Sequence, residues 1–448
     1  MAEQEMKSPE ERYQEPLEKL VKFGRFNILD ATVEGLKNLN PAKRALRDIF
    51  INEDGNKVKR KELKDRLKQW HELLSNSEDV EKMIETAQTE VEQAQTLLNT
   101  NVKKGLDETR NLEQSYRTMA LFFKNANTDK IKNLSLLNAS MEQLSNPDMD
   151  QFRSAVKEKL RWAYGTVGKS DNYSLMVVPG FLGSNKVLRE WSKMADDNKV
   201  MLLTDFRDMG DHESVIDLFD SEEYPDVNKT NVIMTCNWLI GREAQKDVGE
   251  EESISVPPSA ALAGKIYNPE VPISQPIAGK EYGTLENVDG VRFKLLQEHI
   301  GQLDQRGLVP MVKEFGGVMP YSARTLYNGD DVGLKTYSVV MVFDWVGKVI
   351  TDFLNRAAFQ NASPKMLNDY RTQIVKFLNS IKGNGKLIKN FAIKKFEPDT
   401  ENGQPDRILV HVVLDPYFPA KSFAIKMDGT AGEGIDNYVW NTKVEEIG

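Results

Sequence analysis

The sequence predicts an α/β (α+β) fold with an N-terminal helical region, a central α/β layer and a β-rich α+β domain at the C-terminal end. Apolar residues recur at three- and four-residue intervals between residues 59 and 144, a pattern typical of amphipathic helices. Short apolar runs then alternate with helix-like spacers between residues 173 and 236, which indicates the strands of a layered sheet. Two more helical patterns and three candidate strands follow from residue 345 onward.

Composition and charge narrow the class of protein. The 448 residues are 40% hydrophobic and 28% charged, which suits a soluble chain of two or three domains. An acidic start and the absence of an apolar run near the ~18 residues that cross a bilayer predict a cytoplasmic protein with no membrane insertion. A net charge of −9 argues against nucleic acid as a partner. The single cysteine, Cys236, permits neither an internal disulfide nor a zinc thiolate cluster.

Residues 1–58 are predicted to form an N-terminal arm punctuated by prolines. One short segment of the arm has helical period and carries an apolar stripe. The corresponding helix either packs on its own domain or is presented to another protein. The stripe consists of Tyr13, Leu17, Leu20 and Val21.

Residues 59–170 are predicted to form successive helices. Apolar residues recur from Val80 to Leu98 at alternating steps of four and three, which is a heptad-like seam about three heptads long. Further stripes run from Leu63 to Leu74 and from Leu112 to Phe123. We expect a small helical bundle whose seam packs within the subunit or on a partner protein. A helical scaffold or adaptor built on this seam is one alternative function.

Residues 171–255 are predicted to form the α/β layer. Buried strands are expected at residues 174–180, 200–205 and 231–236, because each run is short, apolar and followed by polar or turn residues. The stretch from Gly249 to Gly290 is rich in Glu, Ser, Pro and Gly, and is expected to be a loop across the surface.

Chemical motifs are weak throughout the chain. Residues 383–386, Gly-Asn-Gly-Lys, follow a helix and lack the Ser or Thr of a phosphate loop, so they predict a helix stop. An acidic cluster could suit a hard cation, and a metal-dependent hydrolase is the remoter alternative. We interpret the cluster as a solvated loop, and predict no catalytic, metal or cofactor-binding residue and no enzyme activity. The cluster comprises Asp205, Asp208, Asp211, His212 and Glu213.

Several short tracts occur in a fixed order in the last ~190 residues. They are Pro-Ser-Ala-Ala-Leu-Ala-Gly at residues 258–264, Ser-Ala-Arg-Thr-Leu at 322–326, Asp-Trp at 344–345 and Pro-Tyr-Phe-Pro at 416–419. In this order they resemble the C-terminal domain of contractile tail sheath proteins. Residues 256–448 are therefore expected to form a tail-sheath-like domain. The positions that carry the resemblance are Pro258, Ser259, Gly264, Arg324, Thr325, Trp345, Pro416 and Pro419.

The N-terminal half contains the predicted helices and the tracts Asn-Leu-Glu-Gln-Ser-Tyr at residues 111–116 and Phe-Phe-Lys-Asn-Ala at 122–126. With these features it resembles the large sheath subunit of type VI secretion systems, in a divergent branch. The resemblance implies a structural subunit of a contractile sheath that surrounds an inner tube of hexameric rings and shortens to drive it through a target envelope. It also implies a small sheath subunit, a baseplate and a recycling ATP-driven unfoldase as partners, self-association into a sixfold helical polymer, and no cofactor. The stripe around Leu17 matches in location the helix that such unfoldases recognise. A sheath protein of a phage tail or of an extracellular contractile injection particle is the alternative within this class.

The last strands are the expected assembly elements. Both faces of the strand at residues 408–414 are largely apolar, so the strand needs cover on each side and pairing along each edge. We expect neighbouring subunits to complete it by strand addition. Arg324 is expected to clamp a carboxylate or carbonyl groups, and Trp345 to lie in the core. The expected assembly residues are Ile408, Val410, Val412, Leu414, Phe423, Ile425 and Met427.

Overall fold

The computed structural model describes most of the chain from residue 57 onward, in two compact units. One unit contains the described residues up to 105 together with 247–249, and the other contains the described residues of 106–246 and 250–448. The stripe of Tyr13, Leu17, Leu20 and Val21 lies outside the described residues, as does Met427. The described residues are 57–76, 79–131, 133–146, 150–168, 172–222, 224, 228–268, 270–400, 404–421, 423–425, 428–430, 438–441 and 445–447.

Two long helices make up most of the described part of the first unit. Helix α4 spans Lys57–Asn76, and α5 spans Val80–Asn125 and continues into the second unit. The seam from Val80 to Leu98 and the stripe from Leu112 to Phe123 therefore belong to one helix, and the expectation of successive shorter helices here was wrong. The physical reason is local: this stretch has no proline and is rich in Glu, Gln, Leu and Lys, which favour helix.

The second unit is built on a five-stranded sheet in the order β1-β2-β3-β7-β8, in which the first four strands run parallel. The predicted strands at residues 174–180, 200–205 and 231–236 are confirmed as β1, β2 and β3. Strand β8 pairs antiparallel with β7 through a two-residue turn. The five strands are β1 Leu175–Val178, β2 Met201–Asp205, β3 Val232–Cys236, β7 Leu308–Glu314 and β8 Gly317–Pro320.

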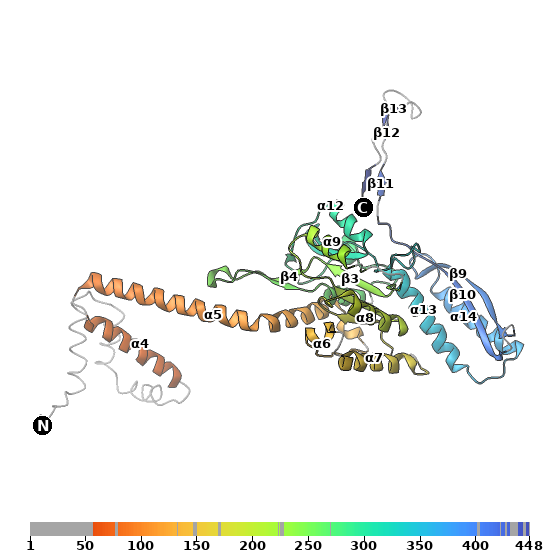
Figure 1. Cartoon of the computed structure of the whole chain (residues 1–448), viewed down its shortest axis with the longest axis horizontal. Coiled ribbons are helices and arrows are strands. Elements are labelled where there is room, and N and C mark those ends of the chain that lie inside the picture. The colour runs from red at the N-terminus through yellow and green to blue at the C-terminus, as the bar shows by residue number, and fades with distance from the viewer. Residues whose placement is uncertain are drawn as a thin grey trace, which may run out of the picture. The chain divides into compact units, whose positions relative to one another are not determined.

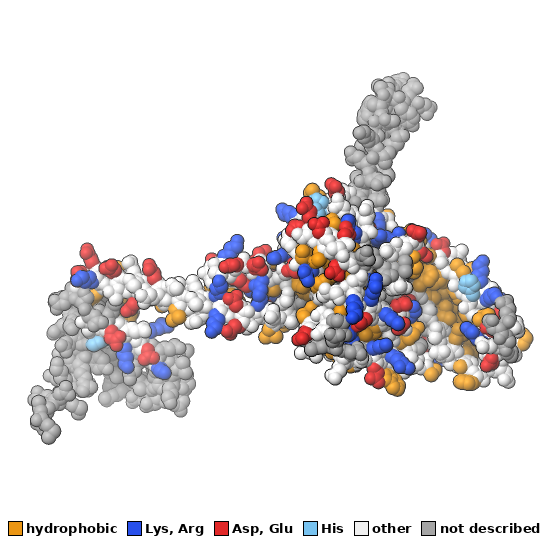
Figure 2. Space-filling view, viewed as in Figure 1, with side chains coloured by type: hydrophobic (Ala, Val, Ile, Leu, Met, Phe, Trp, Pro, Cys, Tyr) orange, Lys and Arg blue, Asp and Glu red, His pale blue; other side chains and the backbone are white. Residues whose placement is uncertain are grey.

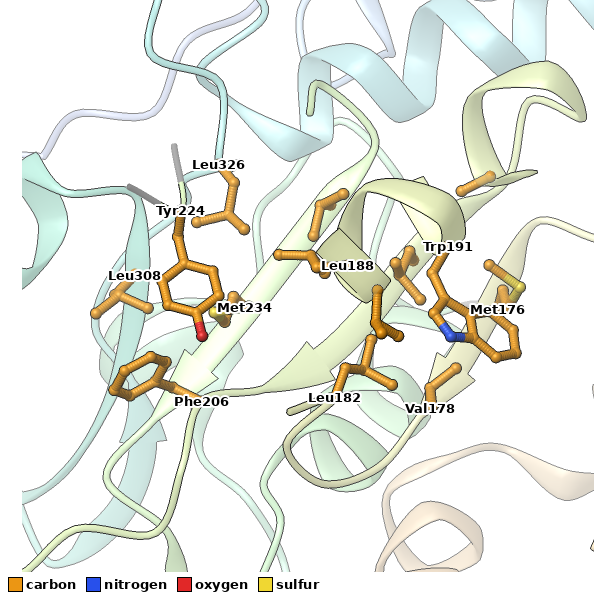
Figure 3. Packing of buried hydrophobic residues seen from close by; sticks show 14 of the residues in the cluster. Met176, Val178, Leu182, Leu188, Trp191, Phe206, Tyr224, Met234, Leu308 and Leu326 are labelled. Atoms are coloured by element: carbon orange, nitrogen blue, oxygen red, sulfur yellow. The ribbon is translucent and has the colours of Figure 1, made fainter. Parts of the chain in front are cut away.

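Helices cover one face of this sheet and bury its larger apolar cluster. Within this cluster Trp191 packs with Met176 and Val178, and the rings of Phe206 and Tyr224 meet edge to face at 5.6 Å (Figure 3). Side-chain caps start two of the helices: Ser184 accepts from the Val187 amide, and Asp211 from the Ser214 amide. The covering helices are α7 Asp150–Gly165, α8 Asn185–Asp197, α9 His212–Ser221 and α12 Gln297–Gln305.

The opposite face of the sheet buries a second cluster, because alternate residues of a strand point to opposite faces. Leu203 and Ile233 contribute to it, together with Leu121 of α5 and the helix α10, Ser259–Ile266. Residues 257–264 are all buried, so the expectation that 249–290 is a surface loop was wrong for this stretch. Its small residues allow α10 to pack closely against neighbouring backbone, which a count of Gly, Pro and Ser does not reveal.

A second, smaller sheet in the order β5-β4-β6 lies in this cluster as well. Its strands pair antiparallel, with Leu239 opposite both Val256 and Val291. The strands are β4 Leu239–Arg242, β5 Ile254–Val256 and β6 Gly290–Val291. The short elements of the unit are η2 Thr128–Lys130, α6 Met141–Ser145, η3 Lys246–Val248, which the unit boundary divides, and α11 Gly279–Gly283.

Two helices and a long hairpin follow the body. Helix α13 spans Tyr337–Arg356 and α14 spans Pro364–Ser380, in agreement with the two helical patterns of the sequence. Ser363 caps α14 and Pro364 opens it. Gly383 and Gly385 follow with φ of 124° and 71°, the left-handed geometry expected of the helix stop. Strand β9, Ile388–Asp399, then pairs antiparallel with β10, Gln404–Pro416, beside these helices (Figure 1).

Four short strands end the chain. Strand β11 pairs antiparallel with β14, and β12 with β13. Phe423 and Ile425 are the first and last residues of β11. The four strands are β11 Phe423–Ile425, β12 Asp428–Thr430, β13 Tyr438–Asn441 and β14 Glu445–Ile447. None of the helices among the described residues is long and apolar enough to cross a membrane.

Candidate functional site: surfaces for assembly

Among the described residues, strand β10 is the longest strand and pairs with β9 alone. The register slips between His411 and Val412, where β9 contributes one extra residue, Lys394. Such a bulge bends the ribbon and increases its twist. One main-chain edge of β10 therefore has no strand partner among the described residues, which is the geometry that strand addition requires.

The two faces of this hairpin differ in cover. Val412 and Leu414 pack with Phe391 and Ile393 onto a small cluster that includes Val346 and Leu378. Residues of the opposite face are more open: Val413 is 42% exposed and His411 is exposed. Ile408 and Val410 are half-buried. The sequence predicted that both faces of β10 need cover. In the structure the chain itself covers one face, and the other is left largely to solvent.

Helices α13 and α14 support the covered face only loosely. Trp345 is half-buried and its ring lies 5.8 Å from that of Phe377, with an interplanar angle of 49°. Figure 2 shows hydrophobic side chains gathered on the surface of this region, between scattered lysines and acids. Most hydrophobic members of the cluster are half-buried, unlike those of the body. Exposed apolar area of this kind marks surfaces that contact other proteins.

Asp304, at the end of α12, joins the body to the root of the C-terminal strands. Its Oδ1 accepts from Ser322 Oγ at 2.6 Å and from Lys421 Nζ at 3.2 Å. Arg324 Nε donates to the Asp304 carbonyl at 3.1 Å, and its Nη2 to the Gln305 carbonyl at 3.4 Å. Arg324 is thus bonded mainly to carbonyl groups, with the Asp304 carboxylate 3.8 Å away. Its role as a clamp stays a prediction.

Asp205 is the centre of a buried hydrogen-bond cluster that involves the first of the sheath-like tracts. Its carboxylate accepts from the Gly180 amide at 2.8 Å, the Ser259 amide at 2.8 Å, Ser259 Oγ at 2.6 Å and the Thr235 hydroxyl. Burial raises the pKa of Asp205 to about 6, although these hydrogen bonds lower it. The interpretation of Asp205 as part of a solvated loop was wrong.

The rest of that tract is explained by packing. A Cβ at Gly264 would lie 2.4 Å from the Phe122 carbonyl oxygen and 3.1 Å from the Ala126 amide nitrogen, so only glycine lets α10 approach the end of α5. Pro258 is buried at the start of α10. Thr325 is also buried, and its hydroxyl donates to the Leu334 carbonyl at 2.6 Å. Pro416 ends β10, and Pro419 is half-buried after it.

The acidic cluster does not form a metal site in the described part of the chain. No group of three or more potential ligands comes together there. Both oxygens of Asp205 are occupied by donors of the protein itself. His212 stacks on His299, with ring centroids 3.6 Å apart. Asp211 accepts from Ser214 as a helix cap, which lowers the pKa of Asp211. The metal-dependent hydrolase hypothesis therefore loses the residues on which it rested.

The part of α5 in the second unit has one anchored face and one open face. On the anchored face Glu113 and Glu250 both accept from Arg242, at 2.9 and 2.7 Å, and Arg110 pairs with Glu250 at 3.2 Å. The hydrogen bond from Arg242 is the main cause that lowers the pKa of Glu250 to about 2. The open face carries an apolar stripe in which Leu112 is 72% and Tyr116 is 69% exposed. Met119 and Phe123 continue this stripe.

Sequence reasoning identified the stripe but not its exposure, and it missed the Arg242–Glu250 network. The strand that ends at Asp205 was visible in the sequence. The donors that bond the Asp205 carboxylate come from residues 180, 235 and 259, which only the fold brings together. The one available signal was the tract Pro257–Pro258–Ser259, a potential helix start that follows a short apolar run.

Comparison with solved structures finds contractile assemblies. The chain is 16% identical to a protein in the contracted helical sheath of the anti-feeding prophage, with a TM-score of 0.49, covering 68% of this chain and 78% of that one. It is 15% identical to a chain of the same particle's baseplate (TM-score 0.48; 70% and 80% covered). A sheath tail protein of Desulfitobacterium hafniense is 10% identical (TM-score 0.36; 59% and 60% covered). Among curated proteins, no significant match was found.

Family models match nearly the whole described chain and carry the assignment. The TssC/VipB-like N-terminal region matches residues 13–102, and the type VI secretion system TssC/VipB central domain matches residues 104–328. The TssC/VipB-like C-terminal domain matches residues 336–446. The chain therefore belongs to the TssC/VipB family, the large sheath subunits of type VI secretion systems.

Proposed function

We propose that this structural sheath subunit polymerises through two surfaces into a contractile sleeve around an inner tube. One surface is the open edge of β10 with its exposed face, and the other is the open face of α5. The observation that carries the proposal is the thirteen-residue strand β10, which pairs with β9 alone among the described residues. A long strand with an unpaired edge promotes aggregation in a monomer but supplies main-chain hydrogen bonds in a polymer.

The open face of α5 suits the small sheath subunit. Leu112, Tyr116, Met119 and Phe123 recur at steps of four, three and four, which is the spacing of a helix that packs on another helix. The opposite face is held to the body by Arg242, Glu113 and Glu250, so the stripe is presented on a fixed support. A helix from the small subunit would bury this stripe without rearranging the body.

The remaining partners follow from the proposed sleeve. The pairs would stack as sixfold rings around a tube of hexameric rings, on a baseplate, and an ATP-driven unfoldase would recycle the contracted form. The helix containing Tyr13, Leu17, Leu20 and Val21 is the proposed recognition element for that unfoldase. Strand pairing between subunits can persist during a rigid-body rotation if the segments that link the strands to each body bend.

Co-expression with the small sheath subunit tests the two surfaces separately. We expect hollow striated tubes from the wild type in negative-stain microscopy. Val413→Glu should still co-purify with the small subunit but form no tubes, because it places a charge on the exposed face of β10. Tyr116→Glu should lose co-purification. Val332→Glu, at a loop residue that is 60% exposed, is the matched control and should form tubes.

Two results would contradict this proposal. The wild type could yield only small soluble complexes with the small subunit, which would remove the polymer itself. Alternatively, tubes could form from this chain alone, which would favour the single-protein sheath of a phage tail or an extracellular injection particle.

A further inference from the structure

Two phenylalanines of the second unit combine a left-handed backbone with an exposed ring. Phe315 has φ of 52° and is 63% exposed, and Phe359 has φ of 68° and is 107% exposed. Only three other non-glycine residues among those described have positive φ, and two of them are asparagines, which tolerate this region well. A bulky ring in this conformation strains the backbone, and such strain is often found at functional positions.

Phe315 occupies the tip of the β7–β8 hairpin. The turn has two residues, Phe315 and Gly316, both with positive φ, as a type I′ turn requires. Asparagine followed by glycine is the preferred pair in such turns, so phenylalanine is a poor choice for the turn itself. The ring is not part of any buried apolar cluster formed by the described residues, and Lys280 Nζ lies 5.9 Å from its centroid.

Phe359 occupies the turn between α13 and α14. The Gln360 amide donates to the Ala357 carbonyl at 3.4 Å as the chain leaves α13. A left-handed residue just after a helix is usually glycine or asparagine. The side chain of Phe359 is fully solvent-exposed, so it does not stabilise the turn by packing.

We propose that Phe315 and Phe359 are anchor residues that insert into apolar pockets of a second copy of this chain in the assembled sheath. This inference rests on the proposed polymer. Aromatic anchors dominate the binding energy of protein interfaces, and both rings are largely exposed in the described part of the chain. Lys280 beside Phe315 suits a pocket with a carboxylate at its rim, and this chain has 68 acidic against 59 basic residues. Two anchors on different elements of one subunit suit a head-to-tail contact that propagates.

Asparagine substitutions separate an anchor from a structural residue. Phe315→Asn and Phe359→Asn relieve the backbone strain, so each variant should unfold at the same urea concentration as the wild type or a higher one. Each should nevertheless raise the critical concentration for tube formation with the small subunit by about tenfold or more. Asn287→Gly is the matched control, because Asn287 also has positive φ, at 63°, without an apolar ring. It should leave the critical concentration unchanged.

Photo-crosslinking identifies the protein that supplies the pocket for each ring. A benzoylphenylalanine at position 315 or 359, in tubes assembled with the small subunit, should crosslink one copy of this chain to another. Crosslinks only to the small subunit or to the tube protein would overturn the proposal, as would asparagine variants that assemble like the wild type. If the wild type forms no tubes, the polymer itself fails, and that outcome is visible before any variant is compared.

Discussion

The α/β body and the C-terminal region of α13, α14, β9 and β10 differ in how completely each buries its own apolar surface. In the body most cluster members are fully buried, and polar groups such as Asp205 are bonded within the chain. In the C-terminal region half-buried residues outnumber buried ones, and β10 has an unpaired edge among the described residues. In the proposed sheath both properties would serve, because a rigid body would transmit force whereas an incomplete sheet would join one subunit to the next.

Removal of the buried carboxylate should have the largest effect on the body. Asp205→Ala leaves four donor groups without an acceptor, among them Ser259 Oγ and the Gly180 amide. We expect a loss of about 4 kcal/mol in the free energy of unfolding. Urea denaturation followed by tryptophan fluorescence measures it. Val413→Ala on the exposed face of β10 should cost under about 1 kcal/mol. Equal losses from the two variants would remove the contrast between the regions.

A glycine pair tests whether close packing is confined to the body. Gly264→Ala places a Cβ 2.4 Å from the Phe122 carbonyl oxygen, so helix α10 must shift, at a cost of about 2–3 kcal/mol. Gly105→Ala adds the same methyl group in α5 where no atom lies within 4 Å. The better helix propensity of alanine should stabilise the chain there by up to about 1 kcal/mol. Thermal unfolding of both variants should therefore shift in opposite directions.

The pH dependence of the free energy of unfolding should also reveal the buried carboxylate of the body. The pKa of Asp205 is raised from an ordinary value of 3.8 to about 6, so between these values the folded state binds more protons than the unfolded state. The contribution of Asp205 to the free energy of unfolding is therefore fully present below about pH 4 and is lost as the pH rises through 6. Between pH 4.5 and 7 we expect the wild type to lose about 2 kcal/mol relative to Asp205→Asn.

Urea titrations of both proteins across this window measure that difference. The effect of pH on the stability contributed by Glu250 has the opposite sign. The pKa of Glu250 is lowered to about 2, so its contribution to the free energy of unfolding is lost only as the pH falls below about 4.5. Keeping the window above pH 4.5 separates the two groups. A constant difference between wild type and Asp205→Asn would show that the pKa of Asp205 is not raised in the folded protein.

The smallest effect is expected where the C-terminal strands leave the body. Lys421 donates to Asp304 at 3.2 Å, and its side chain is 40% exposed, so the ion pair is screened by solvent. Lys421→Met should change the free energy of unfolding by less than about 0.5 kcal/mol. Hydrogen exchange at residues 417–421 should nevertheless become faster, because this contact holds the root of the strands. Unchanged hydrogen exchange would mean that the ion pair between Lys421 and Asp304 does not restrain residues 417–421.

Local patterns of the sequence determined the elements of this protein. The apolar runs that became β1, β2 and β3 and the stripes of α13 and α14 were readable because strand and helix periods arise from backbone geometry over a few residues. The order of short tracts likewise indicated the family to which the chain belongs. These signals do not depend on which elements meet in space.

The tertiary structure alone decided burial and partnership. Asp205 and Ser259 are 54 residues apart, and their contact exists because β2 and α10 pack together. The spacing of the stripe at Leu112 and Tyr116 would be the same in a covered helix and in an exposed one. The stripe is exposed because of the position of this part of α5 on the body. The strength of a hydrogen bond or an apolar contact depends on long-range packing and the exclusion of water, which no local period encodes.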